Sequence, residues 1–269
     1  MNRGRAVSAF ALALACSGTV ACAEPEPDSP VMTLGVAASP SLSEAFTEMI
    51  DVFEDEHPGV RVSLELGRSD TIAEGMPARD DINVFASADE GSMRWLVDTG
   101  VAVEPVVFAR NHVVVAVPSG NPRQVTGLRD LERPDLRVGL CELDVPCGRA
   151  AESLLAVAGV ATPPGVPRDP SSRALAARLA DHELDVGIVY RTDVAASHGW
   201  VALAEVDQRD RELAQDAGTT RYTVARIPGA EDGPDAEAER AAASEFLELV
   251  TSDRGRRALE IAGLAPLPQ

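Results

Sequence analysis

Five positions in this sequence could donate hydrogen bonds to a small anion without adding positive charge. Four of them stand at or beside expected helix starts: Ser41, Ser69, Cys147 and Ser172. Free backbone N–H groups and the helix dipole favour negative charge at such places. Tyr190 ends an expected strand and offers a phenolic O–H. A tetrahedral dianion needs donors and no nearby acceptors, and residues of these types at such places can supply them.

Each of these positions also has a purely structural interpretation. Ser41 and Glu44 form an S-x-x-E pattern, which predicts a capping box at a helix start. Ser69 fits a plain turn serine, and Tyr190 fits a strand-end tyrosine that packs on a neighbour. Cys147 and Ser172 carry little side-chain signal, because the contact expected there is through the backbone.

The elements that must position these residues alternate between strands and helices. After an apolar run at 31–37, apolar residues recur with helical period from 42 to 53, and residues 60–66 then alternate like a half-buried strand. Further strands are expected at 82–86, 113–117, 137–140, 186–190, 201–204 and 221–227, and further helices after 67–71 and at 90–99, 149–158, 172–180, 236–250 and 253–262. The longest loops are expected at 207–219 and 228–235. This alternation predicts an α/β fold with mainly parallel sheets.

The first residues read as an export signal. Arg3 and Arg5 precede an apolar stretch at 6–15 and then small residues, as in a signal peptide. The stretch is too short for a membrane-spanning helix, which needs about 20 apolar residues. Residues 1–22 are therefore expected to be a leader, and the acidic, proline-rich segment 23–30 a flexible tether.

The four cysteines refine this interpretation. Cys16 and Cys22 each follow an alanine in the manner of a bacterial lipoprotein signal. Lipidation at Cys22 is preferred, since it leaves the even pair Cys141 and Cys147 in an oxidising compartment. Cys16 is the alternative, and ordinary cleavage near 21–23 is a third. The expected location is the outer face of the cell membrane, lipid-anchored, or else the periplasm or extracellular space.

Composition excludes several classes of partner. The 269 residues hold 24 basic side chains, all arginine, against 43 acidic ones, for a formal net charge of −19. Neither nucleic acid nor anionic lipid suits such a chain, and losing Arg3 and Arg5 makes it more negative still. The anion must then be held by local donors. No G-x-S-x-G, H-E-x-x-H or P-loop pattern occurs, and the four histidines stand singly, so neither an enzyme nor a metal centre is indicated.

Several segments resemble the substrate-binding protein of bacterial molybdate ABC importers. They keep their order and spacing from residue 31 to residue 263, and the clearest are VAASPSLSEAF (36–46), FEDEHPGVRVSLELGRSDTIA (53–73), INVFASADEGSM (82–93), FARNHVVVAVPSGNP (108–122), LCELDVPCG (140–148), DVGIVYRTDVAA (185–196) and FLELVTSDRGRRALEIAG (246–263). The resemblance implies a two-lobed, periplasmic-binding-protein-like clamshell of type II. Lobe one would comprise residues 31–110 plus 225–269, and lobe two residues 111–224, with the ligand in the cleft.

The resemblance also implies a function. It implies a monomer, not an enzyme and without a cofactor, that binds molybdate or tungstate and delivers it to ABC permease membrane subunits. The oxyanion would be held at the family's matching positions: Ser41, Ser69, Cys147, Ser172 and Tyr190. Molybdenum would be bound only as the oxyanion, not as a free cation. Open alternatives are a binding protein for another oxyanion such as sulfate, a clamshell-fold enzyme, and a scaffold lipoprotein.

Two further expectations concern the site. A cysteine upstream of VPCG recurs in this family, and a disulfide between Cys141 and Cys147 is expected in an exported protein, with two free thiols as the alternative. The sequence also departs from the family at Pro40, Asp70 and Ser172. Asp70 would repel a dianion if it faced the cleft, so it is expected to point outward or to cap a helix, while Ser172 would add a hydroxyl donor.

Overall fold

The computed structural model describes residues 32–162, 164–228 and 236–267. The expected leader 1–22, the tether 23–30 and the lipidation candidates Cys16 and Cys22 lie outside the described residues. Within the described part, no helix is both long and apolar enough to cross a bilayer.

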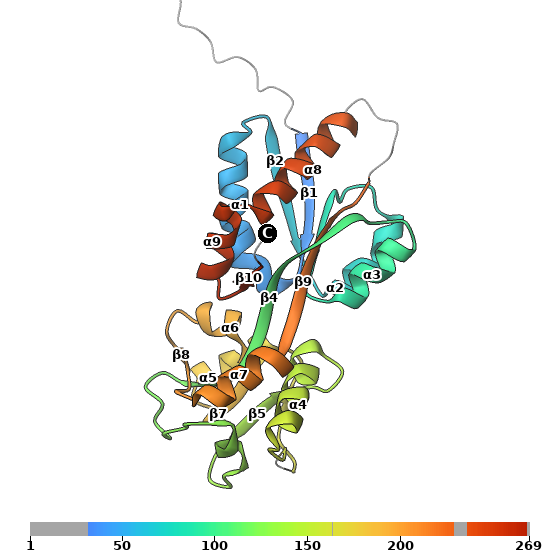
Figure 1. The fold of residues 1–269 in the computed structure, drawn as a ribbon. Coiled ribbons are helices and arrows are strands. Elements are labelled where there is room, and N and C mark those ends of the chain that lie inside the picture. The colour runs from blue at the N-terminus through green and yellow to red at the C-terminus, as the bar shows by residue number, and fades with distance from the viewer. Residues whose placement is uncertain (1–31, 163, 229–235, 268–269) are drawn as a thin grey trace, which may run out of the picture. The chain divides into compact units, whose positions relative to one another are not determined.

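One half of the sheet is built on three parallel strands. The strand β1 (Met32–Ala38) lies between β2 (Val60–Leu66) and β3 (Val84–Ser87), and β9 (Thr219–Arg226) joins β3 antiparallel. Successive side chains of a strand face opposite ways. Accordingly Val36 belongs to a core with α1 (Ser43–Glu56), α8 (Ala236–Thr251) and α9 (Asp253–Ile261), whereas Ala37 belongs to a core with α2 (Ser69–Gly75) and α3 (Glu90–Asp98) (Figure 1).

A long strand, β4 (Val103–Pro118), leads from this half into the other (Figure 1). Its first part pairs with β9 and with β10 (Ala265–Pro266), and its last part with β7 (Val186–Tyr190) and β8 (Val201–Leu203). The register with β9 shifts between Val107 and Ala109. The ribbon of β4 and β9 therefore connects the two halves of the sheet.

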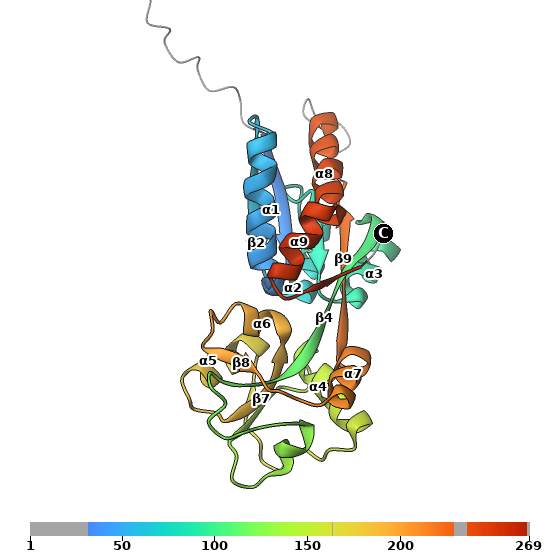
Figure 2. The same cartoon turned by 60° about the vertical axis from the view of Figure 1, so that its left-hand side comes forward.

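The second half has a core of its own. The strand β5 (Val138–Cys141) pairs parallel with β6 (Arg168–Asp169) and with β7. Its hydrophobic cluster draws only on residues between 113 and 214. The helices α4 (Pro146–Ala158), α5 (Ser172–Ala180), α6 (Arg191–Ala195) and α7 (Gln208–Ala217) surround it (Figure 2). Three short 3-10 helices also occur among the residues described: η1 (Pro40–Leu42), η2 (Met76–Ala78) and η3 (Leu128–Glu132).

The α/β class is confirmed, with two corrections. The sheet is mixed rather than mainly parallel, because all four recorded partners of β4 run antiparallel to it. The loop expected at 207–219 is wrong, since most of it forms α7. The Asp207 side chain caps this helix by accepting a hydrogen bond from the Asp210 N–H at 2.8 Å, and Ala214 packs into the second core. Most of the other loop, 228–235, lies outside the described residues.

Candidate oxyanion site

The five residues expected to bind an oxyanion line one cavity of about 280 Å³. The cavity lies where the carboxyl ends of strands from both halves of the sheet meet. Ser41, Ser69 and Ala88 follow β1, β2 and β3, and Cys147 and Ser172 follow β5 and β6. Ligands of α/β proteins bind at this end of the strands.

Two hydroxyls and a backbone N–H meet on one wall of the cavity. Ser39 Oγ and Ser69 Oγ are 2.7 Å apart, and both accept from the Ala88 N–H, at 3.0 and 3.1 Å. Ser39 and Ser69 are both buried. A pair of hydroxyls carries two hydrogens, of which their mutual bond uses one. The other hydrogen is left to donate to a group in the cavity.

Ser41 has a different neighbour. Its Oγ lies 2.7 Å from the Tyr222 hydroxyl, and Tyr222 is fully buried on β9. The capping box expected from Ser41 and Glu44 is wrong: η1 holds Ser41, the N-cap position of α1 is Leu42, and no side chain caps that end. Pro40 fits this arrangement as the first residue of η1, where a backbone N–H is not needed.

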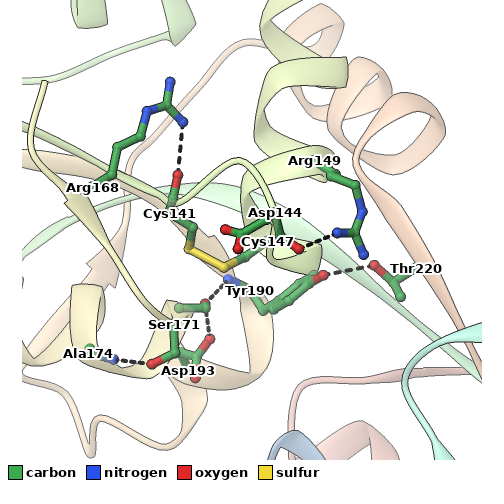
Figure 3. Close-up of a disulfide and its surroundings, with 11 residues drawn as sticks. Cys141, Asp144, Cys147, Arg149, Arg168, Ser171, Ala174, Tyr190, Asp193 and Thr220 are labelled. Carbon is green, nitrogen blue, oxygen red and sulfur yellow. Dashed lines mark hydrogen bonds between the residues drawn. A yellow bond between two sulfur atoms is a disulfide. The ribbon is translucent and has the colours of Figure 1, made fainter. Parts of the chain in front are cut away.

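A disulfide fixes the loop on the opposite wall. Cys141 at the end of β5 is bonded to Cys147 in the first turn of α4, with Cα atoms 5.8 Å apart (Figure 3). Gly148 packs directly against the backbone of this loop, since a Cβ there would come within 1.8 Å of the Glu142 carbonyl oxygen. The loop between the two cysteines is thus held at both ends, and it presents the amino end of α4 to the cavity.

The hydroxyl of Ser172 is already used within the protein. It donates to the Asp193 carboxylate and accepts from the Tyr190 N–H at 2.9 Å. The expectation that Ser172 adds a hydroxyl donor is therefore wrong. Ser171, the preceding residue, caps α5 by accepting from the Ala174 N–H at 3.1 Å. Ser172 is the first residue of α5, so its backbone N–H has no acceptor within the helix.

Tyr190 closes one side of the cavity. Its hydroxyl lies 2.9 Å from Thr220 Oγ1 on β9 (Figure 3). Burial raises the pKa of Tyr190 to about 12, so the phenol keeps its proton at neutral pH and can act as a donor. Burial also raises the pKa of Asp193, although the hydrogen bond from Ser172 opposes this shift.

The charged groups around the cavity are largely engaged with one another. Asp70 accepts from both Arg68 Nη2 at 2.7 Å and Arg68 Nε at 3.1 Å, and this pairing lowers its pKa to about 2. It also accepts from the Thr71 N–H in α2. Asp89 is occupied in capping α3. The negative charge of Asp70 is thus balanced by Arg68 rather than left facing the cavity alone.

Sequence reasoning missed several residues of this site. Ser39, Ala88, Asp193, Thr220 and Tyr222 all lie in the cavity wall or bond to a residue that does. Ser39 had a signal, because it shares the S-P-S turn with Ser41. Tyr222 lies in the segment 221–227, which the sequence indicates only as a strand, and Thr220 lies between that segment and the expected loop at 207–219. Nothing in the sequence brings β9 beside Ser41.

Comparison with known proteins places this arrangement. The family described as bacterial extracellular solute-binding protein matches residues 34–265. The chain belongs to this family. The expected membership is thereby confirmed, and so is the expectation of a binding protein for transport rather than an enzyme. Solute-binding proteins of this family are extracellular, which agrees with the expected export.

One relative and three solved structures are similar to this solute-binding protein over most of its length. The molybdate-binding protein ModA of Mycobacterium tuberculosis is 30% identical over 261 residues, covering 94% of this chain and 95% of the relative. Three solved structures share the clamshell fold. They are a substrate-binding domain of a putative molybdenum ABC transporter from Clostridium difficile (TM-score 0.69, 18% identity, 88% of this chain and 100% of that one), the periplasmic molybdate-binding protein of Azotobacter vinelandii (0.66, 18%, 88% and 100%), and the sulfate-binding protein SubI of M. tuberculosis (0.66, 15%, 88% and 87%).

Proposed function

We propose that this solute-binding protein binds molybdate, or the similar tungstate, in the cavity between the two halves of its sheet and delivers it to an ABC permease. The observation that carries the proposal is the convergence of uncharged donors on one small cavity. Ser41, Ser69 and Tyr190 supply hydroxyls, while Cys147 and Ser172 supply backbone N–H groups at helix starts. The 30% identity to a molybdate-binding protein over nearly the whole chain supports the same ligand.

Neutral donors account for binding of a dianion by an acidic protein. Hydrogen bonds to an anion are charge-assisted and stronger than neutral ones. Backbone N–H groups at helix starts add the helix dipole without a side-chain charge. The net charge of −19 is then no obstacle, because three acids that line the cavity are engaged: Asp70 is paired with Arg68, Asp89 caps α3, and Asp193 accepts from Ser172.

Anion size supports molybdate over sulfate. In a desolvated cage shaped for a larger tetrahedral anion, a smaller one leaves donors unpaired, at about 1–3 kcal/mol for each unmade bond. A sulfate-binding protein shares the fold, so sulfate is the second candidate. Sulfate binding tighter than molybdate binding would favour that candidate.

The remaining parts of the proposal concern organisation. Lobe one is residues 31–110 plus 225–269, and lobe two is residues 111–224. Separate hydrophobic clusters along the first and last parts of β4 support two lobes, although Tyr222 and Val224 pack in the core of lobe one. We also propose that the protein acts as a monomer, anchored at the outer face of the membrane through lipid on Cys22.

Calorimetric titration of the mature chain tests the ligand. Molybdate and tungstate should bind more tightly than sulfate and phosphate, and absence of heat with both would refute the proposal. Ser41→Ala and Ser69→Ala should each weaken molybdate binding by about tenfold, the cost of one charge-assisted hydrogen bond. Ser244→Ala is the matched control, since Ser244 lies exposed on α8 and bonds only within its own helix. Unchanged affinity in both cavity variants would refute the site.

A further inference from the structure

We propose that Asn111 and Tyr222 are positioning residues that force the Ser41 hydroxyl to act only as a donor toward the ligand, and that this one-way chain selects fully deprotonated oxyanions. The inference rests on the proposed function and deepens it. Neither Asn111 nor Tyr222 needs to touch the ligand. Both act by fixing the direction of the hydrogen bonds that link Asn111, Tyr222 and Ser41.

The chain begins at Asn111, a fully buried residue in the middle of β4. Its amide nitrogen Nδ2 donates to Thr192 Oγ1 at 3.0 Å and to the Tyr222 hydroxyl oxygen at 3.2 Å. Its amide oxygen Oδ1 accepts from the His112 N–H at 3.0 Å. Because a backbone N–H can only donate, this last bond fixes which end of the amide is oxygen. The group that faces Tyr222 is therefore a donor.

The donor at Asn111 fixes, in turn, the direction of the Tyr222 hydroxyl. Its side chain is fully buried, and the Asn111 nitrogen that it contacts cannot accept a hydrogen. Within the described part of the chain, the remaining partner of its hydroxyl is Ser41 Oγ, at 2.7 Å. Leaving a buried hydroxyl hydrogen unpaired is costly. The Tyr222 O–H therefore donates to Ser41.

Ser41 then has its own hydrogen free. Its side chain lines the cavity, and Tyr222 is its recorded side-chain partner among the described residues. If Ser41 instead donated to Tyr222, the tyrosine hydrogen would point at the Asn111 amide and be stranded. The chain therefore runs from Asn111 through Tyr222 to Ser41 and into the cavity, and it does not reverse.

This direction has a consequence for the ligand. An oxygen that carries a proton, as in hydrogen phosphate, needs an acceptor opposite that proton. The fixed chain holds the Ser41 oxygen toward the Tyr222 hydrogen and the Ser41 hydrogen toward the ligand. A Ser41 hydroxyl without that donor could turn its oxygen to the proton of the ligand. Sulfate and hydrogen phosphate are similar in size and differ by this proton. The chain should therefore favour sulfate over hydrogen phosphate, independently of the size effect that favours molybdate.

Competition measurements with Tyr222→Phe test the proposal. Removing the tyrosine hydroxyl frees Ser41 to rotate, so molybdate affinity should fall by about threefold to tenfold, the usual effect of one hydrogen bond. More specifically, the ratio of sulfate affinity to phosphate affinity, measured by displacement of bound molybdate at pH 8, should fall toward one. Thr223→Val is the matched control on the same strand, because the buried Thr223 hydroxyl has no hydrogen-bond partner among the described residues. That variant should keep both the affinity and the ratio.

A double-mutant cycle separates positioning from a structural effect. In the Ser41→Ala background, Tyr222→Phe should no longer change molybdate affinity, since it acts through Ser41. Additive losses, or an unchanged sulfate-to-phosphate ratio in Tyr222→Phe, would overturn the proposal while leaving molybdate binding itself standing. If Tyr222→Phe does not fold, Asn111→Asp provides the same test. It replaces the amide donor by a carboxylate that can accept from the Tyr222 hydroxyl, so Ser41 can donate to Tyr222 and turn its oxygen to the ligand. The ratio of sulfate to phosphate affinity should then fall, and an unchanged ratio would again overturn the inference.

Discussion

The guanidinium of Arg173 on α5 donates to the Glu44 carboxylate on α1 at 3.2 Å, across 129 residues of sequence. The two helices belong to different halves of the sheet, on opposite sides of the cavity. The pair therefore links the two halves of the sheet beside the cavity, which Arg173 lines. Because closure around a ligand is a hinge motion, a contact of this kind stabilises the closed form.

Glu44→Gln should weaken molybdate binding by up to about fivefold, since an exposed ion pair contributes at most about 1 kcal/mol. Loss of a negative charge near the cavity would by itself tighten anion binding, so the direction of the change is decisive. The measurement is calorimetry at low and high salt, and the difference from the native protein should shrink at high salt. Tighter binding in Glu44→Gln would contradict a bridging role.

Arg68 is expected to neutralise the Asp70 carboxylate and so to reduce its repulsion of an anion in the cavity. In Arg68→Gln, the Asp70 carboxylate loses its bidentate partner at the rim of the cavity, and its charge then repels the ligand. Molybdate affinity should fall by about fivefold. The double variant Arg68→Gln with Asp70→Asn should regain most of this loss. Failure of the second substitution to restore affinity would mean that Arg68 acts on the anion directly.

Reduction of the Cys141–Cys147 disulfide should destabilise the protein by about 2 kcal/mol, the figure for closing so short a loop. The loss is read as a lower Tm in the presence of dithiothreitol. Molybdate affinity should fall as well, because the amino end of α4 loses its anchor to β5. The Cys141→Ser, Cys147→Ser variant is the control and should show no response to dithiothreitol. An unchanged Tm on reduction of the native chain would contradict the expectation.

Asp193→Asn should stabilise the protein at neutral pH and tighten molybdate binding by about fivefold, because it removes a buried negative charge beside the cavity. Burial raises the folded-state pKa of Asp193, so its favourable contribution is complete below the ordinary value of 3.8 and is lost as the pH rises through the raised pKa. The difference in Tm between variant and native protein should therefore grow from pH 3.5 toward pH 7. A difference that is constant with pH would show that Asp193 does not titrate in this way.

Much of the fold could be predicted because local pattern and tertiary environment agree. Strand β2 alternates along 60–66 and begins and ends where expected, as does β7 at 186–190 and the helix α5 at 172–180. The sequence does not predict the helix α7, because the segment is strongly polar. Its buried side is seen in the packing of Leu213 and Ala214 in the second core. Likewise, strand direction depends on which distant segments pair, and the pattern along a strand does not report it.

The candidate site was predictable for residues at helix starts and strand ends, where spacing alone indicates a donor. The directions of the hydroxyls were not. Ser41 bonds to Tyr222 over a separation of 181 residues, and the Ser172 hydroxyl donates to Asp193. Such partners are chosen by the packing of β9 and α6, and no local pattern in the sequence specifies them.

The ribbon of β4 and β9 also orders the assembly of the molecule. The core around β1 combines residues 34–109 with residues 222–264, whereas the core around β7 is complete within residues 113–214. When the chain emerges from its amino end, all residues of the core around β7 are present before the core around β1 has all of its residues. The core around β1 must wait, with Phe46 and Phe53 lacking their partner Phe246, until the last two helices arrive. The core around β7 can therefore form before the core around β1 is complete, and the cavity between them is completed only when residues 222–264 have joined residues 34–109.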